Sequence, residues 1–220
     1  MTLTLALPAL VGAVVGALMG RAVRTLIARV PQALLDQQQH SPERTKHTAP
    51  GPRRGLVELL CALWLAACSV QWGASLEAVA QGGAGLCLIA LAFIDAEHLL
   101  LPDVLTQPLL WAGLLAASQG WTAVTAEQAL LGTALGYAII AVPAMLYRWR
   151  TGSDGLGLGD AKLLAATGAW QGPLAVPAVL LAAGVCSLVW LAWRKGLRTA
   201  EPYPFGPWLA TASLFGWLWP

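Results

Sequence analysis

Long apolar runs follow one another along almost the whole chain, with only short polar segments between them. They lie at about residues 3–19, 56–70, 76–94, 104–117, 126–146, 161–170, 173–193 and 207–219. Of the 220 residues, 57% are hydrophobic and 11% are charged, against roughly 25% charged residues in ordinary soluble domains. Helices satisfy their own backbone polar groups inside a bilayer. The sequence therefore predicts an all-α, polytopic integral membrane helical bundle.

The number of spans depends on the shortest runs. Some runs fall short of the ~20 residues that cross a bilayer untilted, so the lengths are compatible with six to eight spans. The run at 161–170 is either a short span or a re-entrant segment. If it crosses, every Lys and Arg falls on the same, cytoplasmic side as the polar segment 31–55; if it does not, Arg194, Lys195 and Arg198 fall outside. Because cytoplasmic loops collect basic residues, we expect about eight spans with both chain ends outside.

The composition also sets the expected organisation of the chain. We expect a first transmembrane helix at residues 1–30, a short cytoplasmic loop at 31–55 and a membrane domain at 56–220. Gly12, Gly16 and Gly20 recur every four residues in the first run, which predicts close packing of that helix against another.

The four cysteines form no Cys-x-x-Cys pair and lie in apolar runs, so we expect them to be small buried packing residues that form no disulfide and no zinc site. The net charge of +2 gives no indication of nucleic-acid binding.

Two carboxylates stand where apolar runs begin or end. Asp160 closes the sequence Gly-Leu-Gly-Asp before the run at 161–170, and Asp95 follows the run at 76–94. An acid at a bilayer edge is costly, which favours a functional role and a partner. Two carboxylates that approach closely share a proton, so one can activate a water while the other polarises a carbonyl. Gly157 and Gly159 leave room beside Asp160 for a substrate backbone and for a bend into the helix.

Structural roles are equally compatible with the isolated carboxylates. From its spacing alone, Asp160 is as well explained as the N-cap of the helix that follows. Asp103, which follows Pro102, is best explained as an entry turn and cap for the helix that starts at Val104.

Four further polar residues near these positions also have two interpretations each. Glu97 and His98 are interpreted as solvated interfacial groups, although His98 could hydrogen-bond Asp95 three residues earlier if the stretch is helical. Lys162 is interpreted as a snorkelling side chain, with a counter-ion role toward Asp160 or headgroups as the alternative. Glu58, in the first turn of its run, is explained by the helix dipole or by a polar interhelical contact.

Four segments together resemble the type IV prepilin peptidase family of aspartic membrane proteases. They are Phe-Ile-Asp-Ala-Glu-His-Leu-Leu-Leu-Pro-Asp at 93–103, Gly-Leu-Gly-Asp-Ala-Lys-Leu-Leu-Ala-Ala at 157–166, Gly-Leu-Val-Glu-Leu-Leu at 55–60 and Pro-Phe-Gly-Pro-Trp-Leu-Ala at 204–210. Gly-x-Gly-Asp alone is shared by other intramembrane aspartic proteases. The resemblance implies that Asp95 and Asp160, and not Asp103, form the catalytic pair within a peptidase domain at 56–220. The candidate supporting or substrate-binding residues are then Gly157, Gly159, Lys162, His98, Asp103 and Glu58.

The resemblance implies an activity and a location. It implies cleavage of the basic leader of type IV prepilins or pseudopilins, after a glycine and at the cytoplasmic edge of the bacterial inner membrane. The expected partners are that leader with its apolar helix and membrane lipid, with no nucleic acid and no cofactor. Many members carry two Cys-x-x-Cys pairs between the first two spans, associated with zinc and with methylation from S-adenosylmethionine. Segment 31–55 contains no cysteine, so we expect no zinc, and the region associated with methylation is missing.

Two other hypotheses remain. One is a protease of the Gly-x-Gly-Asp type that acts on a different membrane substrate. The other is a transporter or assembly protein in which the acids relay protons or anchor helices without any peptide cleavage. The chain lacks the internal repeat that transporters often have.

Overall fold

The computed structural model describes residues 2–37, 55–152, 157–195 and 203–218, which form eight helices and no strand. The helices are α1 (Thr2–Gln37), α2 (Leu56–Trp72), α3 (Leu76–His98), α4 (Asp103–Ser118), α5 (Ala126–Thr151), α6 (Leu158–Gln171), α7 (Ala175–Lys195) and α8 (Gly206–Leu218). The all-α prediction is confirmed. The chain divides into two compact units, Met1–Leu100 and Leu101–Pro220.

Four helices are long and apolar enough to cross a membrane by themselves. They lie at Ala6–Val30, Leu76–His98, Ala126–Thr151 and Ala175–Trp193, whereas Leu56–Trp72 is a shorter apolar helix. The prediction of several membrane spans is therefore confirmed. The described helices α4, α6 and α8 have 16, 14 and 13 residues, and the full count of eight spans stays a prediction.

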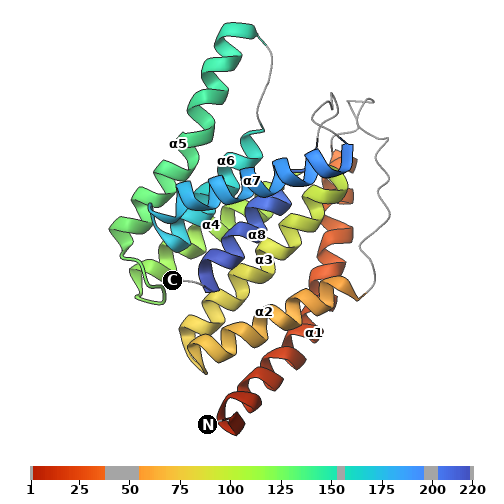
Figure 1. Cartoon of the computed structure of the whole chain (residues 1–220), viewed down its shortest axis with the longest axis vertical. Coiled ribbons are helices and arrows are strands. Elements are labelled where there is room, and N and C mark those ends of the chain that lie inside the picture. Colours follow the sequence, from red (N-terminus) through yellow and green to blue (C-terminus); the bar gives the residue numbers. More distant parts are fainter. Residues whose placement is uncertain (1, 38–54, 153–156, 196–202, 219–220) are drawn as a thin grey trace. The chain divides into compact units, whose positions relative to one another are not determined.

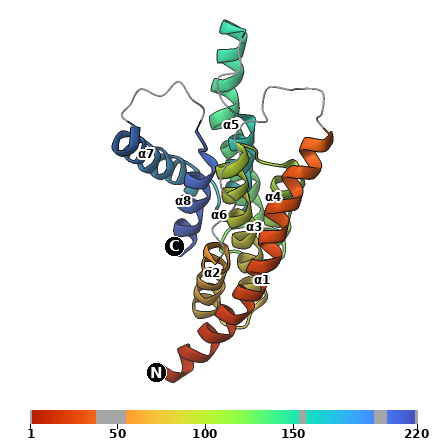
Figure 2. The same cartoon turned by 90° about the vertical axis from the view of Figure 1, so that its right-hand side faces the viewer.

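In the first unit, α1 and α2 pack backbone against backbone. A Cβ added at Gly12, Gly16 or Gly20 would collide with α2, at Leu65, Ala62 and Glu58 respectively. The predicted packing role of these glycines is thus confirmed. Figures 1 and 2 both show α1 running beside α2.

Helix α1 is longer than the first apolar run. It continues to Gln37, past our expected end at residue 30 and into the segment 31–55 that we expected to be a loop. The added residues are mostly Ala, Leu and Gln, which are good helix formers and extend a helix already nucleated. The rest of the expected loop, 38–54, lies outside the described residues.

In the second unit, α6 is the central helix. Nine of its residues, from Ala161 to Trp170 with only Lys162 left out, are buried. Trp170 Nε1 donates to the Leu109 carbonyl of α4 at 2.8 Å, and the Thr167 and Ser213 hydroxyls lie 2.9 Å apart between α6 and α8. These contacts fix α6, and with it Asp160 at its start.

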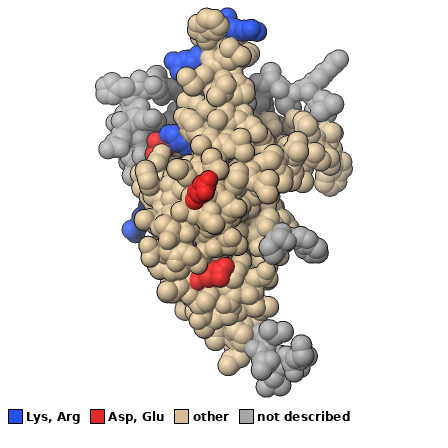
Figure 3. Space-filling model, turned by 90° about the vertical axis from the view of Figure 1, so that its left-hand side faces the viewer, with Lys and Arg blue, Asp and Glu red and all other residues tan. Residues whose placement is uncertain are grey.

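The surfaces of the long helices are apolar and exposed. Leu181 is 68% exposed and Trp193 is 87% exposed on α7. On the face drawn in Figure 3, most of the surface carries no charged side chain. Such a surface fits contact with lipid rather than water.

Candidate active site

Asp95 lies in the last turn of α3, within the first unit. Its preceding neighbour Ile94 is fully buried, and Asp95 itself is only 6% exposed. A carboxylate so far from water is stable only with polar or charged partners. The stretch is helical through His98, as a hydrogen bond between His98 and Asp95 would require. That hydrogen bond stays a prediction.

Helix α3 ends immediately after this carboxylate. Leu99 takes a left-handed conformation with φ 52°, and its N–H donates to the Asp95 carbonyl at 2.9 Å. Among the described residues, Leu99 is the only non-glycine residue with positive φ. Left-handed backbone is costly for a residue with a Cβ and often marks functional segments. No feature of the sequence predicts it, because Leu is an unusual choice at such a position.

Asp160 is in the first turn of α6, and its N–H donates to the Gly157 carbonyl at 3.2 Å. The N-cap is Gly157, not Asp160, so the N-cap interpretation of Asp160 is wrong. The Asp160 Oδ2 atom lies 3.6 Å from the place a Cβ on Gly157 would take, so the carboxylate is turned toward the helix start. Free N–H groups and the positive end of the helix dipole are found there, and both favour a carboxylate.

The two glycines of the motif have different surroundings. Gly157 is exposed and its φ of −71° needs no glycine. At Gly159 a Cβ would lie 3.2 Å from the Leu101 Cβ. The space that we expected to be free for a substrate beside Gly159 is therefore filled by Leu101, and the open side is at Gly157.

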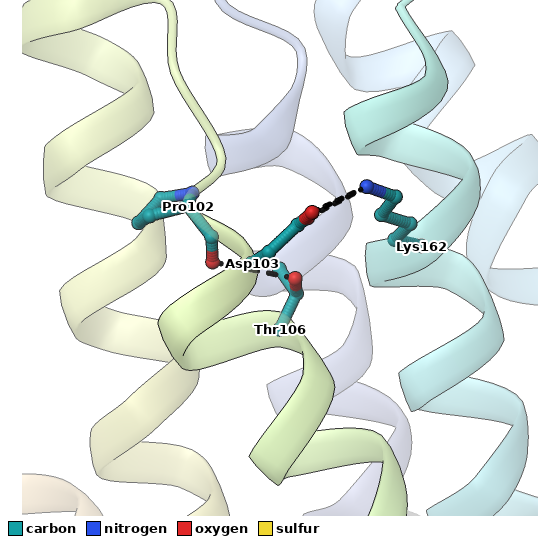
Figure 4. A network of polar contacts seen from close by, with 4 residues as sticks. All are labelled: Pro102, Asp103, Thr106 and Lys162. Atoms are coloured by element: carbon teal, nitrogen blue, oxygen red, sulfur yellow. Dashed lines mark hydrogen bonds and ion pairs between the residues drawn. The ribbon is translucent and has the colours of Figure 1, made fainter. Parts of the chain in front are cut away.

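Asp103 and Lys162 form an ion pair across α4 and α6 (Figure 4). Lys162 Nζ lies 2.6 Å from Asp103 Oδ1 and 2.8 Å from Oδ2. Pro102 is the N-cap of α4 and Asp103 is its first residue, so the cap interpretation of Asp103 is wrong. Lys162 pairs with Asp103, and the snorkelling interpretation of Lys162 stays a prediction. The two residues are 59 positions apart, which is why neither interpretation could anticipate the pair.

Glu58 makes both of the contacts considered for it. One carboxylate oxygen accepts the Gly55 N–H at 3.1 Å, and the other lies 2.8 Å from Arg24 Nη1 of α1. The acid therefore caps α2 and also links it to α1. In the last turn of α3, His98 Nε2 lies 3.8 Å from Glu97 Oε2, so these two groups contact each other rather than being separately solvated.

The described residues offer no site for a metal. No group of three or more His, Cys, Asp or Glu side chains gathers among them. Cys61 and Cys68 are buried, as expected, and the four cysteines are free, but Cys186 is exposed. The packing interpretation is wrong for Cys186, which lines an open groove between α7 and α8.

Asp95 belongs to the first unit and Asp160 to the second, and their pairing stays a prediction. Three residues that contact candidate site residues were not identified from the sequence. They are Leu99, Leu101 and Arg24, which contact Asp95, Gly159 and Glu58 respectively. For Leu101 a weak signal exists, because Pro102 restricts the residue before it to extended backbone. For Arg24 the regular spacing of Gly20 and Arg24 along α1 is a signal, since both positions face Glu58.

A sequence profile described as the type IV leader peptidase family matches residues 83–192. This range contains α3 from Gly83 onward, all of α4 to α6 and most of α7. It therefore contains both Asp95 and Asp160. No solved structure matches the chain.

Several curated proteins are similar over most of the chain, and three of them are named prepilin leader peptidase/N-methyltransferase. The protein of Dichelobacter nodosus is 47% identical over 131 residues, which are 60% of this chain and 44% of that protein. The protein of Pectobacterium carotovorum subsp. carotovorum is 41% identical over 79% of this chain and 63% of its own length. The protein of Pseudomonas aeruginosa is 40% identical over 78% of this chain and 60% of its own length. The chain thus spans about half to two thirds of the relatives it matches.

Proposed function

Because the chain belongs to the type IV leader peptidase family, we propose that it is a membrane-embedded aspartic endopeptidase. Its substrates are type IV prepilins or pseudopilins, from which it removes the short basic leader after a glycine. The observation that carries the proposal is that the family match at 83–192 includes Asp95 and Asp160. These acids stand at the end of α3 and the start of α6. Because ionisable groups at a membrane are costly, acids at both positions favour a functional role.

The proposed chemistry is acid–base hydrolysis by the two carboxylates. The ionised carboxylate removes a proton from water, and the resulting hydroxide adds to the scissile glycine carbonyl. The protonated carboxylate donates to the carbonyl oxygen in the same step. Collapse of the tetrahedral intermediate breaks the C–N bond. The leaving amine takes the proton that the first carboxylate removed from water, and a hydroxyl of the intermediate returns a proton to the second carboxylate. No covalent intermediate, metal or cofactor takes part in this sequence.

The proposed setting is the bacterial inner membrane, with cleavage on its cytoplasmic side. Eight spans place Asp95, Asp160 and every Lys and Arg at that side, in accord with the preference of basic residues for cytoplasmic loops. A prepilin helix lying among the spans would present its leader junction at the same level. The exposed apolar surfaces of α1 and α7 supply contact with lipid.

Co-expression with a tagged prepilin that carries a Gly-Phe leader junction tests the proposal. We expect a gel shift, and a product mass that starts at the Phe, only when the protein is present. The same mass shows whether a methyl group is added, which the named relatives raise as a question and the cysteine-free segment 31–55 argues against. An unchanged prepilin beside fully inserted protein would refute cleavage of this substrate. It would favour another membrane substrate or a role without peptide cleavage.

A further inference from the structure

The ion pair between Asp103 and Lys162 lies beside Asp160 in sequence but does not include it. Lys162 is two residues after Asp160, and its ammonium contacts both carboxylate oxygens of Asp103. The N-cap of α4 is Pro102, with no side-chain cap hydrogen bond, and Thr106 Oγ1 donates to the Pro102 carbonyl at 3.3 Å. Figure 4 shows the Lys162 side chain reaching across from α6 to the first turn of α4.

Gly159 and Lys162, which is the α6 residue of the ion pair, lie on one face of α6. Gly159 and Lys162 are three residues apart and therefore share a helix face. Gly159 lies against Leu101, and Lys162 contacts Asp103, so both contact the segment that begins α4. Asp160 is about 100° from Gly159 and about 200° from Lys162 around the helix, at roughly 100° per residue. Two contacts on one face thus fix the rotation of this first turn, and the rotation sets the direction of the Asp160 carboxylate.

The pair is poorly placed to stabilise the fold. The Asp103 side chain is 60% exposed and the Lys162 side chain 29% exposed. Exposed ion pairs contribute little to stability because solvent screens them and two side chains must be held in place. The nine buried residues of α6 hold the helix body without it. What the pair adds is a restraint at the helix start, where fewer contacts exist.

We propose that Asp103 and Lys162 are a positioning pair that directs the Asp160 carboxylate toward the scissile bond. The inference rests on the proposed peptidase function. In this arrangement the Lys162 ammonium pairs with the Asp103 carboxylate. Neither residue contacts the reacting atoms.

The test compares wild type with D103N, K162Q and the double variant D103N/K162Q, using a purified prepilin. Each single variant should lower kcat by about 10- to 100-fold, as a small misplacement of a catalytic group does. KM should stay within about twofold, since substrate binding is unchanged. The double variant should be no slower than the slower single variant, because the restraint is already lost.

The matched controls are E127Q, which removes an acid from the first turn of α5, and R150Q, which removes an exposed base near the end of α5. Both should cleave as wild type does.

A second measurement does not depend on activity. Amide hydrogen exchange at residues 158–163 should rise in D103N and K162Q, while exchange in α5 stays unchanged. Wild-type kcat in both single variants, multiplying effects in the double variant, a rise in KM alone, or unchanged exchange would each overturn the positioning role. Failure of the proposed function gives a different result. In that case wild type itself leaves the prepilin uncut, and the exchange measurement still shows whether the pair restrains the start of α6.

Discussion

Gly132 of α5 and Gly168 of α6 lie with their backbones in direct contact. A Cβ added at either glycine would collide with the backbone carbonyl of the other. Both contacts involve backbone atoms, which cannot move aside as the end of a flexible side chain can. The approach lets α5 and the buried α6 pack closely along their length, and it holds the helix that begins with Asp160.

We therefore expect G132A and G168A to lower the free energy of unfolding by about 1–3 kcal/mol, the usual cost of overpacking. The matched control is G184A on α7, where a Cβ would meet nothing within 4 Å. That change should be neutral or stabilise by about 0.5–1 kcal/mol, because Ala favours the helix. Unfolding of the purified protein in detergent, followed by loss of helical signal, measures all three. A G168A protein as stable as wild type would contradict the close contact.

The hydroxyls of Thr167 and Ser213 are expected to couple α6 to α8. They are 2% and 0% exposed, and each hydroxyl oxygen also lies within hydrogen-bond distance of a carbonyl of its own helix, 3.1 Å from Leu163 and 2.8 Å from Leu209. Because a hydroxyl has one hydrogen, one of the two donates across to the other and the second donates within its own helix. T167V should cost about 1 kcal/mol of stability, the typical net value of a hydrogen bond. T167V/S213A should cost less than the sum of the single changes. T211V is the control, since Thr211 is exposed and its hydroxyl donates to the Pro207 carbonyl within α8, and it should change stability by less than about 0.5 kcal/mol. Strictly additive effects of T167V and S213A would argue against the coupling.

The eight-span topology depends on whether α6 crosses the membrane. Its 14 residues rise about 21 Å at ~1.5 Å per residue, less than the ~30 Å hydrocarbon core. The charge distribution nevertheless predicts a crossing. A reporter that is active only in the cytoplasm should be inactive when fused after Gly172 and active when fused after Lys195. The opposite pattern would show that α6 is re-entrant and that there are fewer spans.

The apolar runs predicted where helices occur, because burial in lipid or protein dominates helix formation along this chain. The run expected at 126–146 is α5 at Ala126–Thr151, and the run at 161–170 is α6 at Leu158–Gln171. The added residues at the ends include Arg148, Arg150, Asp160 and Gln171, and hydrophobicity alone does not reveal the helix turns that contain them. The glycines of α1 were also predicted correctly, since a spacing of four places them on one helix face.

The partners of the polar residues could not be predicted in the same way. Asp103 was interpreted from its neighbour Pro102, but its carboxylate contacts Lys162, 59 residues away. Local capping and long-range pairing compete for the same carboxylate, and only the fold decides which forms. The left-handed conformation of Leu99 was equally hidden, because tertiary contacts must offset its local cost.

The most direct measurement is the rate of leader removal by wild type, D95N and D160N in liposomes of bacterial lipid. Each Asn side chain keeps the size of the Asp but can neither accept the proton nor give it back. We expect each variant to insert normally and to be slower by about 10²–10⁴-fold, the range that general acid–base groups contribute. The double variant should be no slower than the slower single one, and E127Q should cleave as wild type does. Cleavage at the wild-type rate by either D95N or D160N would contradict a catalytic pair of aspartates.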